Sequence, residues 1–292
     1  MPANQKITLS LRAPAKINLS LQILARRPDG YHDLDTVMQK LDLADLLTIA
    51  VTDKPGIMLR CPDSGLPADH TNIVWKAAET FLAVCRIKKK GVAITLRKNI
   101  PIAAGLGGGS SDAAATLTGL NRLLATGLTT SELIELARML GADVPFFVTD
   151  YGAVRATGIG DQMVPLPSLT NCTVVLVNPG FSVSTRWVYE KYALTINGKD
   201  SKLYDCPKKM NHVFPYIGSN DLEQVTISSY PEVGLLKQKL LDLGAVSVMM
   251  SGSGPTVFGI FSDGDSGSST LVRQAVAALQ QNSVKVFVTQ PV

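Results

Sequence analysis

The strongest constraint on this chain is a glycine-rich run at residues 101–112, which reads Pro-Ile-Ala-Ala-Gly-Leu-Gly-Gly-Gly-Ser-Ser-Asp. Its glycines leave the backbone free to adopt positive φ angles and to approach a ligand without a Cβ atom in the way. Three alanines follow the run and favour a helix. A glycine loop that leads into a helix directs unpaired backbone N–H groups and the positive end of the helix dipole toward one place. The run therefore predicts an anion site, most often for phosphate, in preference to a flexible turn.

Two common nucleotide-binding motifs do not fit this loop. A Walker loop needs a Gly-Lys pair followed by Ser or Thr, whereas Gly198 and Lys199 are followed by Asp200. The dinucleotide fingerprint lacks its third glycine, because Ser110 stands there. The sequence beyond the loop is also helical where that fold requires a second parallel strand. The loop is therefore expected to bind phosphate by another scheme.

Composition excludes several classes of protein. Hydrophobic residues make up 46% of the chain and charged residues 18%, which is typical of a globular protein with a sizeable core. The net charge of +4 suits an enzyme that handles small polyanions and gives weak support to nucleic-acid binding. The cysteines show no metal spacing, and no apolar run reaches a membrane-spanning length. We expect a cytoplasmic chain with no nucleic-acid partner, no membrane partner and no metal ligands of its own.

The second half of the chain alternates between strand-like and helix-like segments. Strands are expected at 173–177, 246–250, 256–261 and 284–288, and helices at 183–192, 231–243 and 271–281. This order, β-α followed by a helical insertion and then β-β-α-β, is the split βαβ arrangement of a ferredoxin-like domain. In the first half we expect a helix at 110–124, and Thr129 with Glu132 forms a capping box that opens another helix.

Six motifs, in order along residues 9–261, extend the interpretation of the loop. The first reads Pro-Ala-Lys-Ile-Asn-Leu at 14–19, the second is the glycine run, and the third reads Ser-Gly-Ser-Gly-Pro-Thr at 251–256. Three further strings lie at 27–32, 141–147 and 178–180. In this order and spacing the motifs resemble those of the GHMP small-molecule kinases.

The resemblance implies an α+β, two-domain GHMP kinase fold. Residues 1–165 would form an N-terminal ATP-binding α/β domain, similar to the second domain of ribosomal protein S5, and residues 166–292 a C-terminal ferredoxin-like domain. It also implies an ATP-dependent small-molecule kinase that receives Mg²⁺ with its nucleotide and is a monomer or a weak homodimer. The loop residues that would bind ATP are Pro101, Gly105, Leu106, Gly107, Gly108, Gly109, Ser110 and Ser111.

Within the superfamily, the three further strings are similar to those of kinases that act on a cytidine-diphosphate-linked tetritol. Such kinases phosphorylate its 2-hydroxyl in the non-mevalonate pathway of isoprenoid biosynthesis. One alternative is another GHMP kinase that acts on homoserine or mevalonate. A second alternative, from a different class, is a non-catalytic ATP-binding module.

The resemblance implies that Lys16 and Asp143 form the catalytic pair. From the residues alone, Asp143 is either the N-cap of a following helix or a functional acid in an apolar setting. Lys16 lies in an expected strand, where the pattern alone favours a solvated side chain. The resemblance makes Asp143 the base for the substrate hydroxyl and Lys16 the ammonium that favours the alkoxide. Asn18 shares a face with Lys16 and is expected to hold this pair or the substrate.

The remaining substrate contacts are also implied by the resemblance. Tyr31 would stack on a cytosine ring, and His32 would recognise its hydrogen-bonding edge. From the pattern alone these two are a turn anchor and a loop residue. Tyr189 is preferred to Phe181 or Trp187 as the second stacking ring. Two further groups complete the expected substrate contacts: Thr185 in the same pocket, and the backbone of Gly252 and Ser253, which from the pattern alone is only a tight hairpin.

Overall fold

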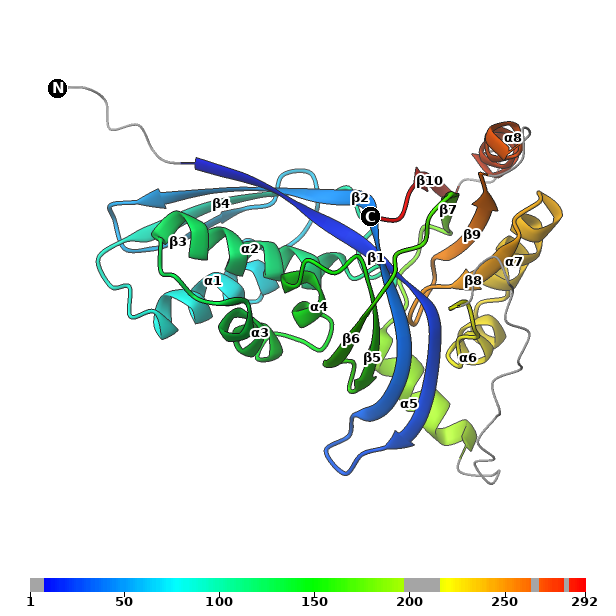
Figure 1. Cartoon of the computed structure of the whole chain (residues 1–292), viewed down its shortest axis with the longest axis horizontal. Coiled ribbons are helices and arrows are strands. Elements are labelled where there is room, and N and C mark those ends of the chain that lie inside the picture. Colours follow the sequence, from blue (N-terminus) through cyan, green and yellow to red (C-terminus); the bar gives the residue numbers. More distant parts are fainter. Residues whose placement is uncertain (1–7, 197–215, 264–267, 281–283) are drawn as a thin grey trace. The chain divides into compact units, whose positions relative to one another are not determined.

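The computed structural model describes residues 8–196, 216–263, 268–280 and 284–292 (Figure 1). The chain divides into two compact units, each assembled from segments that are separate in the sequence. Unit 1 comprises Met1–Ala15, Ala44–Ile100 and Gly107–Asp150, and unit 2 comprises Lys16–Leu43, Pro101–Leu106 and Tyr151–Val292. Strands β1 (Thr8–Arg26) and β2 (His32–Thr52) therefore contribute residues to both units. A domain boundary at residue 165 stays a prediction.

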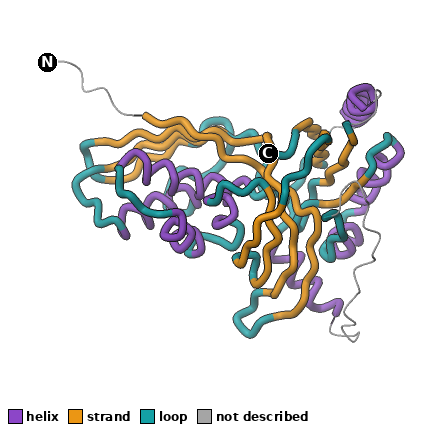
Figure 2. The backbone as a smooth tube through the Cα atoms, in the orientation of Figure 1, coloured by secondary structure: helices purple, strands orange, loops and turns teal. Residues whose placement is uncertain are grey.

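Unit 1 is a sheet with helices on one face (Figure 2). The second half of β2 pairs antiparallel with β4 (Gly91–Arg97), which pairs in parallel with β3 (Gly56–Arg60). The helices are α1 (Ile73–Val84), α2 (Gly108–Leu124), α3 (Thr130–Arg138) and α4 (Val144–Val148). Alternate residues of β4 point into the core because side chains of a strand alternate between faces. Val92, Ile94 and Leu96 thus pack with Phe81 of α1 and Leu117 of α2.

Local sequence determines where these helices begin. The side chain of Asn72 caps α1 by accepting a hydrogen bond from the Val74 N–H group at 2.9 Å. Thr129 and Glu132 form the predicted capping box of α3. Gly107 adopts a left-handed conformation (φ 69°) before α2. Helix α2 begins before its expected start at residue 110 because the glycines that follow join its first turn.

Unit 2 contains a four-stranded antiparallel sheet in the order β10-β7-β9-β8. Its elements are β7 (Cys172–Asn178), α5 (Thr185–Ile196), α6 (Glu223–Ser229), α7 (Pro231–Asp242), β8 (Ser247–Met250), β9 (Val257–Ser262), α8 (Ser268–Gln280) and β10 (Lys285–Thr289). Counted along this half, the strand order is 4-1-3-2, so the predicted ferredoxin-like arrangement is confirmed. Helix α6 was not predicted, and the expected helix end at residue 281 lies outside the described residues.

The rest of unit 2 joins the N-terminal strands to this sheet's core. The first half of β2 pairs with β5 (Ala153–Gly158), which forms a hairpin with β6 (Gln162–Leu166). Leu21 of β1 belongs to the same hydrophobic cluster as Val175 and Val177 of β7, Leu240 of α7 and Leu279 of α8. A single core of unit 2 therefore combines residues from both ends of the sequence.

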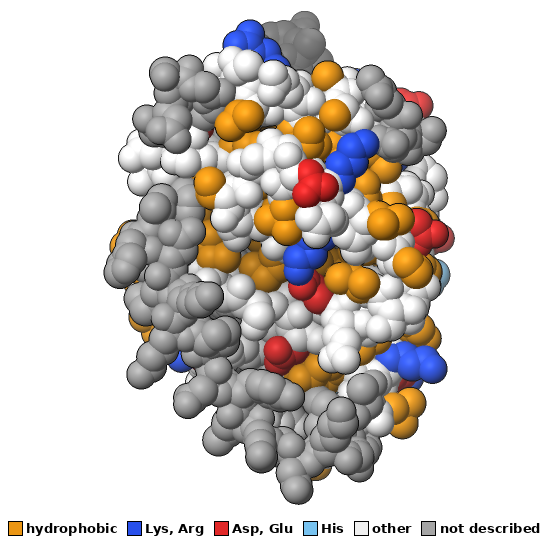
Figure 3. Space-filling model, turned by 90° about the vertical axis from the view of Figure 1, so that its right-hand side faces the viewer, with side chains coloured by type: hydrophobic (Ala, Val, Ile, Leu, Met, Phe, Trp, Pro, Cys, Tyr) orange, Lys and Arg blue, Asp and Glu red, His pale blue; other side chains and the backbone are white. Residues whose placement is uncertain are grey.

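Helix α7 shows how this core is covered at the surface. Leu236 and Leu240 are buried, whereas Leu235 is 70% exposed. Figure 3 views the side of the molecule on which α6, α7 and α8 lie, and hydrophobic side chains there are interspersed with charged ones. Across the described ranges, no helix combines the length and the apolar character needed to cross a bilayer.

Candidate functional site

Strand β1 buries two polar side chains of unit 2. Lys16 is 4% exposed and Asn18 is 3% exposed. The Lys16 ammonium donates to Asn18 Oδ1 at 2.5 Å, and Asn18 Nδ2 donates to Thr36 Oγ1 at 2.9 Å. The two residues meet because side chains two positions apart on a strand share a face. The interpretation of Lys16 as a solvated side chain is therefore wrong.

Hydrogen bonds connect this strand to the start of the glycine loop. The Lys16 N–H group donates to the Leu106 carbonyl at 2.9 Å. Ser251 Oγ donates to the Gly105 carbonyl at 2.9 Å and accepts from the Asn18 N–H group at 3.3 Å. A Cβ atom on Gly105 would lie 2.1 Å from the Ser251 carbonyl oxygen, so this close approach requires glycine. No sequence pattern predicts this role for Ser251, although Ser251 begins the third motif.

The third glycine motif forms a buried turn between β8 and β9. Gly252 and Gly254 have positive φ angles of 55° and 80°. The Ser251 N–H group donates to the Thr256 carbonyl, and the Gly254 N–H group donates to the Ser251 carbonyl, both at 2.9 Å. Asn220 Nδ2 donates to the Gly252 carbonyl at 2.7 Å. The motif thus forms a hairpin loop that spans residues 251–256, and its contact with substrate stays a prediction.

Two pairs of predicted pocket residues lie together in unit 2. The rings of His32 and Tyr189 have centroids 5.3 Å apart and are tilted by 34°. Thr185 Oγ1 and Ser253 Oγ are hydrogen-bonded at 2.9 Å. Tyr31 is 58% exposed and has no aromatic partner among the residues that the structure describes. Its ring is therefore open to a ligand from solvent.

The other two aromatic candidates pack elsewhere. Phe181 stacks on Tyr230 at 5.1 Å between centroids, and Trp187 meets the edge of the same ring at 6.0 Å. This packing supports the choice of Tyr189 as the ring beside His32. Burial, and then the charge of Arg26, lowers the pKa of His32. Its Nε2 atom is buried without a hydrogen-bond partner in the described part of the chain, so the imidazole keeps one ring nitrogen for a ligand.

The start of α2 supplies the expected anion-binding groups of unit 1. No side chain caps this helix, and the first intrahelical bond runs from the Ser111 N–H group to the Gly107 carbonyl at 2.9 Å. The N–H groups that precede Ser111 in the first turn have no acceptor within the helix. Ser111 is 1% exposed, and its Oγ atom has no partner among the described residues. Such a helix start can hold an anion.

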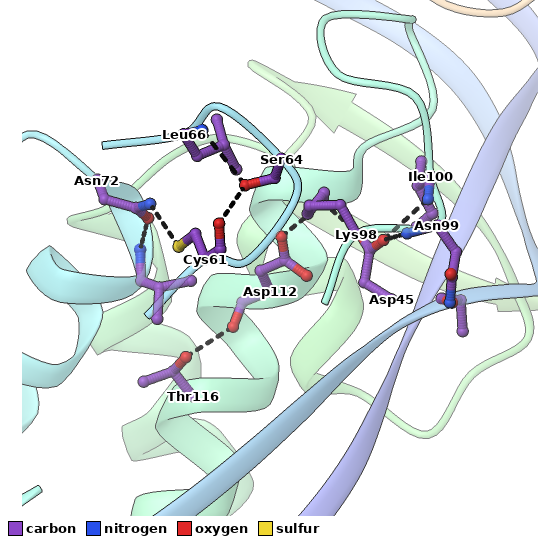
Figure 4. Close-up of polar contacts among 12 residues, drawn as sticks. Asp45, Cys61, Ser64, Leu66, Asn72, Lys98, Asn99, Ile100, Asp112 and Thr116 are labelled. Carbon is purple, nitrogen blue, oxygen red and sulfur yellow. Dashed lines mark hydrogen bonds and ion pairs between the residues drawn. The ribbon is translucent and has the colours of Figure 1, made fainter. Parts of the chain in front are cut away.

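Three charged side chains lie behind this helix start (Figure 4). The Lys98 ammonium donates to Asp45 Oδ2 and, at 2.7 Å, to Asp112 Oδ2. The pKa of Asp112 is raised to about 7, mainly because the carboxyl is buried. The positive charge of Lys98 lowers this pKa, and the negative charge of Asp45 raises it. In the sequence Asp112 is only the end of the glycine run, and no pattern predicts a role for Lys98 or Asp45.

Asp143 is half-buried at the N-terminus of α4 in unit 1. Its φ and ψ angles are −83° and −15°, and its side chain makes no capping hydrogen bond. Asp143 thus occupies the N-cap position of the helix that starts at Val144, as one of the two alternatives predicted, but without a capping hydrogen bond from its side chain. In the described segments, no group of three His, Cys, Asp or Glu side chains is arranged to hold a metal ion.

Comparisons with known proteins agree with the motif order. Residues 72–151 match the family described as GHMP kinases N terminal domain, and residues 206–282 match GHMP kinases C terminal. The chain is 48% identical over 256 residues to a 4-diphosphocytidyl-2-C-methyl-D-erythritol kinase of Pelobacter propionicus, covering 88% of this chain and 90% of that protein. It is 43% identical to the kinase of the same name from Syntrophotalea carbinolica, over 97% of this chain and 99% of that one.

Solved structures show the same fold. A crystal structure of 4-(cytidine 5'-diphospho)-2C-methyl-D-erythritol kinase has a TM-score of 0.78 at 32% identity, covering 97% of this chain and 99% of that chain. A homoserine kinase from Cytophaga hutchinsonii has a TM-score of 0.69 at 19% identity, covering 100% of this chain and 97% of that chain. The latter similarity shows the fold alone.

Proposed function

We propose that this chain, which belongs to the GHMP kinase family, transfers the γ-phosphoryl group of ATP to the 2-hydroxyl of 4-diphosphocytidyl-2-C-methyl-D-erythritol. It is an ATP-dependent small-molecule kinase, like the other members of that family. The observation that carries the choice of substrate is the similarity to curated kinases named for this compound over most of the chain. Its product belongs to the non-mevalonate route to isoprenoids.

The glycine run and the start of α2 would bind the nucleotide. Backbone N–H groups from Gly107 to Ser110 are suited to phosphate oxygens because they lie at the positive end of the helix. The buried Ser111 hydroxyl, which has no partner in the described part of the chain, is suited to donate a hydrogen bond to a phosphate oxygen. The Mg²⁺ ion that accompanies ATP would neutralise charge on the phosphates.

Asp143 and Lys16 would act on the substrate hydroxyl. The Asp143 carboxylate accepts the hydroxyl proton as the oxygen forms a bond to the γ-phosphorus and the bond from phosphorus to the ADP oxygen breaks. The Lys16 ammonium, oriented by Asn18, would stabilise the developing alkoxide. Burial of Lys16 supports this role, because a charge acts more strongly at low dielectric.

The ring pair of His32 and Tyr189 would recognise the cytosine. Tyr31 and Tyr189 would stack on the base, and Thr185 would line the same pocket beside Ser253. The lowered pKa of His32 keeps its imidazole neutral near pH 7, so that it has one donor and one acceptor for the base edge. This pocket separates a base-bearing substrate from homoserine and mevalonate.

A single assay tests the proposed function. ADP production by the purified chain would be measured with the cytidine substrate, its uridine analogue, homoserine and mevalonate. We expect kcat/KM for the cytidine substrate to exceed the other values by at least about 100-fold, which is what a specific hydrogen-bonded site can supply. Turnover of homoserine or mevalonate at a comparable rate would contradict the proposal. Absence of ADP production with every acceptor would favour a non-catalytic ATP-binding module.

A further inference from the structure

A buried lysine lies between two buried carboxylates in unit 1, and the proposed reaction uses none of the three. The Lys98 side chain is 8% exposed, and those of Asp45 and Asp112 are 0% and 2% exposed. Burying charges costs free energy that their pairing does not readily recover, and apolar side chains of similar volume often serve stability as well. The buried charges would be explained if the neighbouring glycine loop needs them to keep its conformation.

The three side chains connect the two ends of the glycine loop. Asp45 Oδ1 accepts hydrogen bonds from the backbone N–H groups of Asn99 at 2.6 Å and Ile100 at 2.8 Å, directly before the loop begins at residue 101. Asp112 lies in the first turns of α2, directly after the loop ends. Lys98 contacts both carboxylates, so one ammonium joins the entry and the exit of the loop (Figure 4).

The same lysine also packs against the loop backbone. A Cβ atom on Gly108 would lie 3.1 Å from Lys98 Nζ and 3.1 Å from Ile100 Cγ2. The backbone at Gly108 therefore packs directly against the side chains of Lys98 and Ile100. A run with so many glycines has a large conformational freedom in the absence of such support.

We propose that Lys98, with Asp45 and Asp112, is a positioning residue that holds the glycine loop in the conformation that binds nucleotide phosphate. The inference rests on the proposed function, because it assumes that this loop binds the phosphates of ATP. Preorganisation of the loop lowers the entropy that ATP binding must remove, so its effect falls on phosphate affinity. The adenosine part of the nucleotide does not depend on it.

The test compares a phosphate-bearing ligand with one that lacks phosphate. In Lys98→Met, we expect the KM for ATP to rise at least about tenfold, while kcat changes less than about threefold and the Ki of adenosine less than about twofold. Leu136→Ala is the matched control, since Leu136 is buried in the same core and lies outside the proposed machinery. A variant that merely loosens unit 1 changes the ATP and adenosine constants together, and this outcome in Lys98→Met would overturn the proposal.

A second variant keeps the test decisive if Lys98→Met does not fold. Asp112→Asn preserves shape and an acceptor oxygen, and we expect a smaller rise in the KM for ATP, about three- to tenfold, again without an effect on adenosine. An unchanged KM for ATP in this folded variant would overturn the proposal. Gly109→Val, measured in parallel, distinguishes failure of the proposed function from failure of the positioning role. If Gly109→Val leaves ATP binding intact, the loop is not the phosphate site. If Gly109→Val abolishes ATP binding while the Lys98 and Asp112 variants leave it unchanged, only the positioning role is contradicted.

Discussion

The proposed function relies on different kinds of chemical group in each of the two units. In unit 1 these groups are mainly backbone N–H groups, which lie in the first turn of α2 directly after Gly107. Unit 2 contributes mainly side chains, in the network of Lys16 and Asn18 and in the rings of His32 and Tyr189. Backbone donors are available to any polyanion with the right shape, whereas side chains discriminate by their individual chemistry. Under the proposed function, we expect the start of α2 in unit 1 to bind phosphate and the side chains of unit 2 to recognise the substrate.

The largest effect is expected at Asp143. This residue is the exception to the contrast between the units, because here unit 1 would act through a side chain. Asp143→Asn should lower kcat by about 10²- to 10⁴-fold, because it removes the proposed general base. The KM for ATP should stay within about twofold. Steady-state kinetics with both substrates measures this, with the exposed Asp150→Asn as the matched control. Near-normal turnover of Asp143→Asn would show that its carboxylate is not the base.

The next effect concerns the backbone donors of unit 1. A Cβ atom on Gly109 would make an ordinary contact of 3.7 Å with Ile73 Cγ2, so the fold accommodates Gly109→Val. Helical side chains lean toward the N-terminus, so the valine would cover the donors of the first turn. Losing two charge-assisted hydrogen bonds, at about 1.5–3 kcal/mol each, should weaken ATP binding by more than about 100-fold.

Calorimetric titration with ATP measures this loss, and thermal unfolding serves as its control. Gly105→Ala, in unit 2, should in addition lower Tm, because its new Cβ atom would clash with the Ser251 carbonyl. A Gly109→Val protein that binds ATP normally would contradict the assignment of nucleotide binding to this helix start.

A smaller effect is expected from the rings of unit 2. Tyr189→Ala and Tyr31→Ala should each weaken the cytidine substrate by about 1–3 kcal/mol, or roughly 5- to 150-fold, because one stacking face is lost. The KM for ATP should hardly change. The exposed Tyr151→Ala, also in unit 2, is the control for loss of a surface tyrosine. If the ring variants changed the KM values of ATP and of the cytidine substrate equally, the expectation that unit 2 recognises the substrate and unit 1 binds ATP would be contradicted.

The smallest effect concerns the pH dependence of unit 1's stability. The pKa of Asp112 rises from 3.8 to about 7 in the folded chain, so the folded state binds this proton more tightly than the unfolded state. The resulting stabilisation is fully present below pH 3.8 and is lost as the pH rises through about 7. Asp112→Asn lacks this dependence, so its Tm relative to the parent should increase between pH 5 and pH 8.

Each kcal/mol of that difference would shift Tm by about 2–4 °C in a protein of this size. Thermal unfolding of both proteins across this pH range measures the difference. Parallel curves would mean that the folded chain does not raise the pKa of this carboxyl.

Local patterns in the sequence carried much of the fold. The order of the strands in the ferredoxin-like half follows from short apolar segments separated by helical periodicity, and the capping box at Thr129 needs only its own neighbours. Helix α6 escaped prediction because it is short and follows a polar insertion. Prediction thus succeeded where a structure depends on residues that are adjacent in the chain.

The candidate site was predictable only in part. Motif resemblance selected Lys16 and Asp143. The strand pattern alone favoured a solvated Lys16, and the pattern around Asp143 left an N-cap and a functional acid equally open. Contacts between distant residues left no pattern: Lys98 and Asp45 are 53 positions apart, and Ser251 and Gly105 are 146 positions apart. A buried ion pair or a close approach of two backbones is a property of the folded chain, and no periodicity in the sequence encodes it.

The core of unit 2 has a consequence for how the chain is made on the ribosome. Leu21 of β1 packs in one cluster with Ala275 and Leu279. The apolar face of β1 can therefore be fully covered only after almost the whole chain has been translated. At about 5–20 residues per second, that wait lasts on the order of ten seconds or more. During this time the exposed strand is open to wrong pairing and aggregation. We therefore expect synthesis of this protein to depend on chaperones more than its finished core would suggest.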